Sequence, residues 1–485
     1  MASFAELTDD MDLAALAAKR SRYTTLMVIL GVFGGGLYGY TLTALSGALI
    51  TMNIGSGEGG LLTTGEQGVI TSLLLLGAVI GSFLSGVLND VLGPRKMILA
   101  GAVLAVPGTI VCAVSPNLVV LCIGRLVMGL AIGFTSTIIP LYLGEMTSST
   151  KRGRVVSVNS VMIVVFQLLA VSVNAVLNLS AAGWRAMMWA VAVPAVLLLV
   201  VSLVIHDSPY YLARHGLDAA AVRELVETRD LEEARAAYES MSDTEPAADA
   251  DRPAKRMSFR EPWLRRVLIV GIGVALMNQV GGQNMINYYA PTIFSSTLGF
   301  DSSMSIVATV PVIAVSAVAA IVGGLGLIDK IDRRVIMLIG LTGTVVFLVA
   351  IGVSYIFVNA NPGSHAAAWV MIVLMMIYLV FVQGMVAPVC WLLLAEIFPS
   401  AVRARGVGYA NIAMNITNCL LSLVFPILLS LIGGSGTFFL FAAINVGCWI
   451  FVKVLVPETR GKSLEQIERE ARSAEIGRAS CRERV

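Results

Sequence analysis

Charged residues are scarce in this chain: Asp, Glu, Lys and Arg make up 13% of its 485 residues. Soluble domains carry about twice that fraction. The 33 basic and 31 acidic residues nearly cancel, leaving a net charge of +2. The strongly basic surface that favours nucleic-acid binding is therefore lacking, and we expect no nucleic-acid partner. Hydrophobic residues reach 57%, which is typical of a chain with long apolar segments.

Patterns that mark catalytic or metal sites are also missing. None of the six cysteines shows CxxC or metal-ligand spacing, and five of them lie in apolar runs, where they serve as small buried hydrophobic residues. There is no His/Cys/Asp cluster and no glycine-rich phosphate loop after a strand. We expect no enzymatic activity, no catalytic residue, no metal and no cofactor.

Long apolar runs dominate what is present. The first 23 residues are acidic and lack the basic start of a signal peptide, so the first run is expected to remain as a membrane span. A span needs about 20 apolar residues and must be helical, because lipid leaves no other partner for the backbone. Twelve runs meet this length, at 24–50, 67–89, 97–114, 117–143, 155–177, 184–205, 267–296, 304–328, 335–358, 368–394, 405–431 and 436–456.

Basic residues predict the orientation of these spans. Lys and Arg gather in the loops on one side, and Arg185 is the exception on the other. The positive-inside rule then places both termini and the long middle loop in the cytoplasm. We expect a multi-pass protein of the plasma membrane.

The predicted organisation has two six-helix bundles around a charged middle segment. Residues 207–262 contain a stretch with helical spacing, LDAAAVRELVETRDLEEARAAYESM, followed by a linker-like run. Residues 475–485, EIGRASCRERV, back-translate to a common sequencing adapter and are expected to be an assembly artefact. The expected parts are a cytoplasmic segment 1–23, a bundle 24–206, a loop 207–262, a bundle 263–456, a cytoplasmic segment 457–474 and the artefact 475–485.

The two halves repeat each other. Glu145 precedes Arg152 by seven residues after the fourth span, and Glu396 precedes Arg403 by seven after the tenth. The loops after the second and eighth spans also match, as Asp90…Arg95 and Asp329…Arg333. Such repeats are typical of carriers whose bundles rock about a site near the membrane centre.

Several motifs occur in an order that resembles the sugar porter family of the major facilitator superfamily over nearly the whole chain. This resemblance implies an all-α membrane fold of twelve transmembrane helices in two pseudo-symmetric bundles, alternating access and a central solute site. The motifs are Gly124-Arg125, Pro140…Glu145 with Arg152-Gly153, Gly183-Trp184-Arg185, Asp207-Ser208-Pro209, Gln279…Pro291, Pro388…Trp391 with Glu396-Ile-Phe-Pro399, and Pro457-Glu-Thr-Arg-Gly461-Lys-Ser-Leu-Glu465.

The resemblance also implies site residues. Gln167, Gln279, Asn284 and Trp391 match family positions that bind sugar hydroxyls or the ring face, and Asn278 replaces a usual glutamine. Two departures affect function. Thr41 stands where proton-coupled members carry an aspartate, and Asn415 replaces a tryptophan. The usual PESPR sequence is His206-Asp207-Ser208-Pro209-Tyr210 here.

The chemistry of the seventh span agrees with a neutral, hydroxyl-rich solute. Its run MNQVGGQNMINYYAP supplies amides and tyrosines that donate and accept hydrogen bonds, Tyr288 among them, and its glycines permit a break. Because neighbouring residues on a helix face different directions, Asn278 and Gln279 are predicted to point apart. The alternative is that these amides only bond helix to helix.

Three further residues stand out in apolar surroundings. Gln167 is a lone amide in its span and is read as a solute contact or a link between helices. Trp391 is read as a gating or stacking residue, or as an interfacial tryptophan. Arg125 is the only cation well inside a span, with a structural or a transport role.

Charged residues at the span ends are predicted to gate the pathway. Ion pairs across the bundle seam would close the cytoplasmic side and break in each cycle. Without an acid near the span centres, facilitated diffusion is favoured over proton symport. The predicted gating residues are Asp90, Arg95, Glu145, Arg152, Asp329, Arg333, Glu396 and Arg403.

The sequence thus predicts a carrier for a small neutral polyhydroxy solute, a sugar or polyol, that works in the lipid bilayer as a monomer. A proton-coupled symporter remains the alternative mechanism. A transporter-like sensor is a competing function, although sensors of that kind carry long cytoplasmic tails, and only about 30 residues follow the last span.

Overall fold

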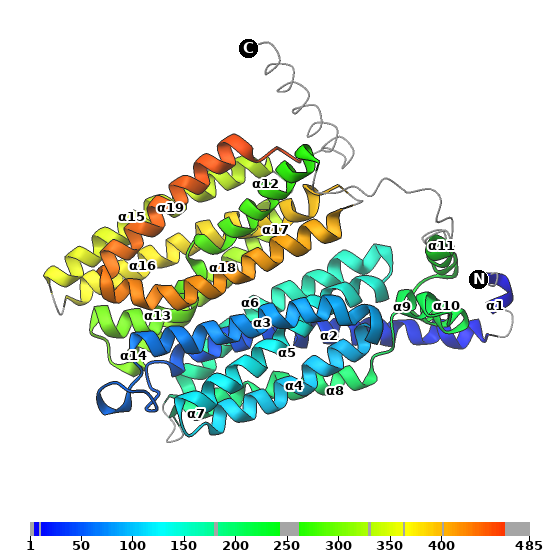
Figure 1. Cartoon of the computed structure of the whole chain (residues 1–485), viewed down its shortest axis with the longest axis horizontal. Helices are drawn as coiled ribbons and strands as arrows, with labels where there is room; N and C mark the ends of the chain where they lie inside the picture. Colours follow the sequence, from blue (N-terminus) through cyan, green and yellow to red (C-terminus); the bar gives the residue numbers. More distant parts are fainter. Residues whose placement is uncertain are drawn as a thin grey trace, which may run out of the picture. The chain divides into compact units, whose positions relative to one another are not determined.

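The computed structural model describes residues 4–8, 11–178, 183–242, 261–327, 331–361, 364–399 and 402–460. Every regular element within these residues is a helix (Figure 1). Twelve helical stretches of the described chain are long and apolar enough to cross a membrane. They coincide with the twelve predicted runs to within a few residues at most ends, so the predicted all-α membrane fold is confirmed.

The chain divides into two compact units, 1–48 with 73–253 and 49–72 with 254–485. Helix α3 (Thr64–Leu92), which follows a short 3₁₀ turn at Glu58–Gly60, contributes to both. The other membrane helices of the first unit are α2 (Leu13–Ala48), α4 (Pro94–Val114), α5 (Leu118–Met146), α6 (Ser149–Leu177) and the pair α7 (Gly183–Ala190) and α8 (Ala192–Val204).

Helices α2 and α6 pack closely along their length in the first unit. The contact depends on the glycines of the first span, because a Cβ on Gly35 would lie 2.1 Å from the carbonyl oxygen of Asn159. A Cβ on Gly39 would lie 2.0 Å from the carbonyl oxygen of Ile163. The absence of side chains at these glycines therefore permits the close packing of the two helices.

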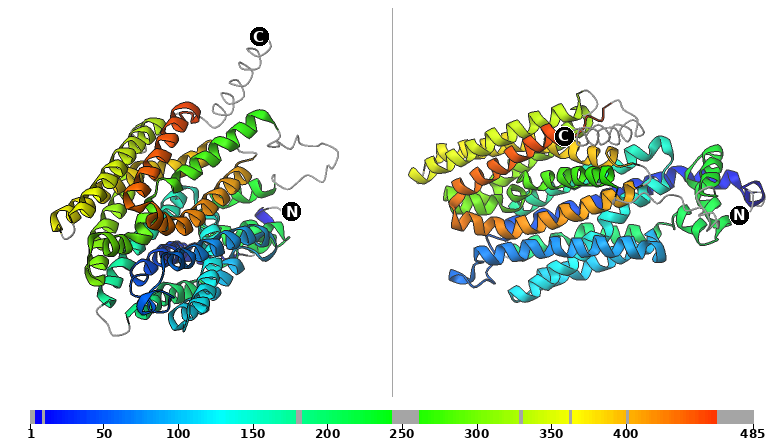
Figure 2. Two further views of the ribbon diagram at one scale, coloured as in Figure 1. Left: turned by 60° about the vertical axis from the view of Figure 1, so that its left-hand side comes forward. Right: turned by 45° about the horizontal axis from the view of Figure 1, so that its top comes forward.

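Four short helices lie at one end of the first unit. They are α1 (Phe4–Thr8), α9 (Pro209–Arg214), α10 (Asp218–Thr228) and α11 (Leu231–Ser242). Both views of Figure 2 show the N-terminal helix beside the green helices of the middle segment. Leu16, Leu225 and Tyr238 belong to one buried apolar cluster that joins these helices. Helices α10 and α11 lie in the part of the middle segment where the sequence has helical spacing, and α9 precedes it. Helix α2 begins eleven residues before the predicted first span.

In the second unit, two membrane helices are interrupted and a third ends in a π-helical turn. The seventh span breaks between α12 (Pro262–Val280) and α13 (Gln283–Leu298), where Gly282 has φ +87°, a conformation that favours glycine. The eighth and tenth spans each contain a π-helical turn, at Gly323–Leu327 after α14 (Ser302–Val322) and at Val382–Val386 between α16 (His365–Phe381) and α17 (Ala387–Glu396). The remaining helices are α15 (Arg333–Ala360), α18 (Arg403–Leu431) and α19 (Gly433–Leu455).

The two π-helical turns meet each other. A Cβ on Gly323 would lie 1.8 Å from the carbonyl oxygen of Gly384, so two glycine-containing turns approach at the level of the backbone. Single π turns inside helices are frequent at functional sites. The predicted break in the seventh span is confirmed, and the tenth span is also irregular just before Pro388.

Candidate solute site

The break in the seventh span is held open by side chains from two other helices. The Tyr378 hydroxyl of α16 donates to the carbonyl oxygen of Gly281, and Asn445 Nδ2 of α19 donates to that of Val280 at 3.2 Å. Tyr378 and Asn445 are fully buried. The last carbonyls of a helix have no partner in their own ladder and must find one elsewhere. The break is therefore a built feature of the second unit.

A continuous chain of amides starts at this break. Gln279 Nε2 donates to Asn278 Oδ1 at 3.2 Å, and Asn284 Nδ2 donates to Gln279 Oε1 at 2.7 Å. Gln283 Nε2 donates to the Asn278 carbonyl oxygen at 3.3 Å. Three of the predicted site amides, Asn278, Gln279 and Asn284, thus lie together although the break interrupts the helix between Gln279 and Asn284.

The prediction that Asn278 and Gln279 point apart is wrong, because their side chains share a hydrogen bond. The rule of diverging neighbours describes Cα–Cβ directions. A glutamine has enough rotatable bonds to fold back along the helix, and α12 ends one residue after Gln279.

Asn418 of α18 extends the chain and was not predicted. Its Oδ1 accepts from Asn284 Nδ2, and its Nδ2 donates to the Tyr288 hydroxyl, each at 3.3 Å. The sequence carried a signal for it, because Asn411, Asn415 and Asn418 recur at helical spacing in the eleventh span. Asn415, the predicted member, instead donates to the carbonyl of Asn411 in its own helix at 3.0 Å.

The arrangement can bind hydroxyl groups and carries no charge. Among the described residues, Gln283 Oε1 and Asn287 Oδ1 are buried without a hydrogen-bond partner. A buried acceptor without a donor costs free energy, of the order of 1–3 kcal/mol. A polyol hydroxyl can supply that donor.

The other predicted solute contact of this unit, Trp391, lies in α17 just after the π turn and is 50% exposed. In the first unit, Gln167 of α6 is buried. Asn174 lies two turns further along α6 and donates to the Ala44 carbonyl oxygen of α2 at 2.9 Å. One amide of α6 therefore links two helices. Thr41 and Arg125 are buried in α2 and α5.

Each unit places a carboxylate and a hydroxyl in the same relation at one end. Glu145 at the end of α5 accepts a hydrogen bond from Ser208, and Glu396 at the end of α17 accepts one from Thr459. Both hydroxyls follow the last span of their unit, directly after Asp207 or Glu458.

Asp207 and Glu458 also contact equivalent helices of the two units. Asp207 lies 3.9 Å from Arg95, at the start of α4. Glu458 accepts from the backbone N–H groups of Arg333 and Arg334, at the start of α15, at 3.1 and 3.0 Å. Carboxylates are favoured at helix N-termini. The internal repeat that the sequence predicted therefore extends to the segments after the sixth and twelfth spans.

The predicted gating residues whose side chains the structure describes have partners within their own unit. Arg333 lies 3.6 Å from Glu396, with both side chains at least three-quarters buried. Asp90 lies 3.9 Å from Arg214, and both are about three-quarters exposed, so this pair contributes little. Asp329 and the side chains of Arg152 and Arg403 lie outside the described residues. Pairing across the seam stays a prediction.

Comparison with known proteins agrees with this architecture. The model of the family "Sugar (and other) transporter" matches residues 27–471. The major myo-inositol transporter IolT of Bacillus subtilis is 36% identical, over 92% of this chain and 94% of that protein. The arabinose-proton symporter of the same organism is 32% identical, over 90% and 92%.

Among solved structures, the inward-open xylose transporter XylE of E. coli superposes with a TM-score of 0.76 at 24% identity, covering 92% of this chain and 99% of that one. The fold and the family match rest on nearly the full length of the protein. The chain belongs to the sugar porter family of the major facilitator superfamily.

Proposed function

We propose that this protein carries a neutral sugar or polyol across the membrane by facilitated diffusion, with the amide chain of the second unit as its main binding surface. The proposal rests on the amide chain itself. Its members are joined by hydrogen bonds and bear no charge; they are Asn278, Gln279, Asn284, Asn418 and Tyr288. Amides that both donate and accept suit a ligand made of hydroxyl groups. The names of the myo-inositol and arabinose transporters above support the same class of solute.

We also assign Gln167 and Trp391 to the proposed solute contacts. Gln167 is a buried amide in the other unit. Trp391 offers an indole whose face can stack on the C–H surface of a ring. Asn415 bonds its own helix and is the weakest member of the predicted set.

The proposal for the driving force follows from the carboxylates. Thr41, at the position where proton-coupled members carry an aspartate, cannot titrate. Glu145 and Glu396 lie at helix ends and accept hydrogen bonds from hydroxyls that follow the last spans. We assign them, with Arg95 and Arg333, to gating. Asp90, Arg152, Asp329 and Arg403 belong to the same proposed group.

The alternative is proton symport, which the name of the arabinose-proton symporter favours. Proteoliposomes separate the two mechanisms. A facilitated carrier exchanges labelled myo-inositol, xylose or arabinose in counterflow, and a protonophore leaves the uptake unchanged. Accumulation against a gradient that collapses with the protonophore would establish symport instead.

Orientation and assembly complete the proposal. By the positive-inside rule, the basic loops support a plasma-membrane protein whose N-terminus, middle segment and C-terminal segment lie in the cytoplasm. Each chain contains its own pathway and acts as a monomer. Proteolysis of the middle segment in intact cells, or thiol labelling of a cysteine introduced there, tests this orientation, since the segment should react only after permeabilisation.

A further inference from the structure

His206 lies at a junction of four elements of the first unit. It sits in the link between α8 and α9, and its backbone N–H donates to the Tyr23 hydroxyl at 3.4 Å. Its carbonyl oxygen accepts from the Tyr142 hydroxyl at 2.7 Å. The Tyr23 and His206 rings are 5.3 Å apart. The backbone of His206 is thus fixed to α2 and α5.

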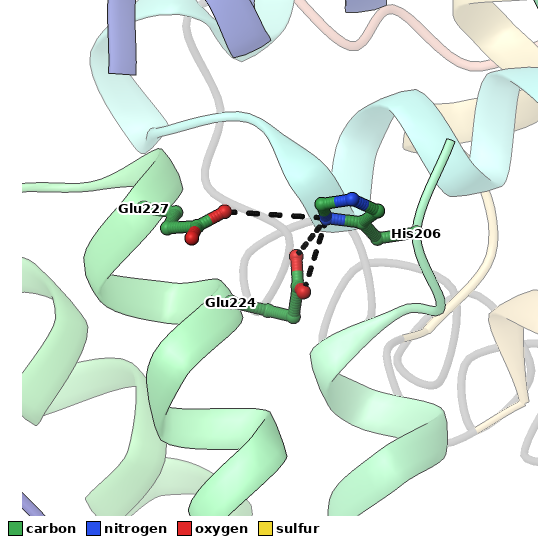
Figure 3. Close-up of side chains that lie close together, drawn as sticks. All are labelled: His206, Glu224 and Glu227. Atoms are coloured by element: carbon green, nitrogen blue, oxygen red, sulfur yellow. Dashed lines mark hydrogen bonds and ion pairs between the residues drawn. The ribbon is translucent and has the colours of Figure 1, made fainter. Parts of the chain in front are cut away.

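The imidazole is turned toward α10. Nδ1 lies 3.1 Å from Glu224 Oε1 and 4.0 Å from Glu227 Oε2 (Figure 3). The His206 side chain is 47% exposed, whereas that of Glu227 is 3% exposed. A cavity of about 750 Å³ borders both glutamates and the imidazole, so protons can reach the ring from solvent.

Basic side chains of three helices complete the surroundings. Lys19 Nζ of α2 and Arg223 Nε of α10 lie 3.6 and 3.7 Å from Glu227 Oε1. Arg22 lines the same cavity. Arg95 at the start of α4 acts on the imidazole at longer range.

A proton fits this cluster better than a metal ion. His206, Glu224 and Glu227 bring three possible donor atoms within 4.8 Å of one another. Two cations already flank Glu227, and a divalent ion would add two more positive charges beside them. A proton on the imidazole adds one charge, and it faces Glu224 directly.

The cluster adjoins a predicted gate. Arg229, one residue after α10, donates to the Glu145 carbonyl oxygen at 2.7 Å, and the Ser208 hydroxyl donates to the Glu145 carboxylate. Glu145 is therefore contacted by the residue two places after His206 and by the residue two places after Glu227. A movement of α10 changes the surroundings of this carboxylate.

We propose that His206 is a sensor of cytosolic pH: its protonated imidazole fastens α10 to the ends of α2, α5 and α8, and loss of the proton releases α10 beside Glu145. His206 stands where the family resemblance leads us to expect a proline, so this device is a feature of this chain. The inference depends on the proposed cytoplasmic orientation and is independent of the solute.

The direction of the pH effect follows from the contacts. The hydrogen bond to Glu224 raises the pKa of His206 above its ordinary value, and the nearby carboxylates act in the same direction. A group whose pKa is raised in the folded state stabilises that state fully below its unfolded pKa, about 6.5 for histidine. The contribution is lost as the pH rises through the raised pKa. Acidification of the cytosol therefore tightens α10, and alkalinisation loosens it.

Histidine titration tests the sensor without any solute. The chain has three histidines, so a protein purified on a histidine-free tag, labelled with ¹³C-histidine and carrying His215→Gln and His365→Gln, reports His206 alone by NMR. We expect a midpoint above the ordinary pKa of histidine, and a lower midpoint after Glu224→Gln. A midpoint at or below the ordinary value would overturn the proposal.

Hydrogen exchange of residues 218–228 tests the link to α10. After correction for intrinsic rates, exchange should be slower at pH 6 than at pH 8, by up to roughly tenfold per unit by which the pKa is raised. His206→Gln should abolish this difference, and His206→Arg should keep α10 protected at both pH values. The matched control is His215→Gln, because His215 Nδ1 contacts the Tyr211 carbonyl oxygen of its own segment at 2.9 Å.

Two further results would contradict the proposal. One is a pH dependence that persists in His206→Gln. The other is a pH dependence that disappears when a chelator is added, which would assign the cluster to a metal. Replacing Gln279 and Asn284 in the other unit should leave the titration unchanged. A failure of the proposed transport function can therefore be told apart from a failure of the sensor.

Discussion

Replacing Tyr378 by phenylalanine tests whether the break in the seventh span positions the amide chain. The ring is fully buried and would stay in place, so the change removes one oxygen and creates no large cavity. It leaves the Gly281 carbonyl, also buried, without the hydroxyl that it accepts from. An unsatisfied buried acceptor costs about 1–3 kcal/mol, and hydrogen bonds in membrane proteins average about 0.6 kcal/mol, so we expect a loss of about 1–2 kcal/mol.

Part of this loss should appear in solute binding. Gln279 precedes the break and Asn284 follows it, and they are joined at 2.7 Å. If the whole loss reached the bound state, affinity would fall by about 5- to 30-fold. Equilibrium binding of labelled solute to purified protein measures this, and thermal unfolding measures the cost to the fold.

Tyr355→Phe is the matched control. Tyr355 is also buried, and its hydroxyl contacts Thr297 Oγ1 at 2.6 Å, near the opposite end of α13 from the break. It should lower thermal stability with little change in affinity. If Tyr378→Phe lowered stability and left affinity unchanged in the same way, the break would be a packing feature and our reasoning would be refuted.

Three further outcomes are expected. Asn418→Ala should weaken solute binding by about three- to thirtyfold, because one residue supports both Asn284 and Tyr288, whereas Asn415→Ala should change binding little; equal effects in an equilibrium binding assay would contradict this order. Gly39→Ala should severely reduce the yield of folded protein, measured by size-exclusion chromatography, because its Cβ would lie 2.0 Å from a backbone oxygen. Gly86→Ala is the control and should be tolerated, because the space around Gly86 is open. Thr459→Ala and Ser208→Ala should each change the rate of counterflow more than equilibrium affinity, because both hydroxyls hold a predicted gate; a pure affinity change would place them elsewhere in the mechanism.

The membrane helices could be read from the sequence because lipid imposes one length and one backbone geometry on every span. The break at Gly281–Gly282 was also readable, since glycines adjoin a run of amides. The side chains that bind the carbonyl groups at the break could not be read from the sequence. Tyr378 and Asn445 come from helices about 100 and 165 residues away, and the seventh span itself contains nothing that identifies them.

The site amides illustrate the same limit. Gln279 and Asn284 were predicted from one local cluster, and the structure joins them. Asn418 was missed because its role depends on the packing of α18 beside α13, although its spacing from Asn411 and Asn415 was visible. The pH sensor proposed at His206 depends on the packing of α10 against α2 and α9, which no motif in residues 207–262 encodes.

The pseudo-equivalence of Ser208 and Thr459 shows what the structure adds to a repeat. The sequence revealed that Glu145 and Glu396 stand at matching positions. Their hydroxyl partners lie 63 residues away in both halves, in segments whose sequences differ. The repeat is therefore preserved in the contacts and in the chemistry of the side chains, although the residues themselves differ.

Counterflow of labelled myo-inositol, xylose and arabinose in proteoliposomes, compared between the native chain and the Gln279→Ala, Asn284→Ala double variant, is the most direct test of an uncharged amide site for a polyhydroxy solute. We expect exchange of at least one of these solutes by the native protein and its near-complete loss in a double variant that still folds. Undiminished exchange in that variant would show that the pathway does not use these amides.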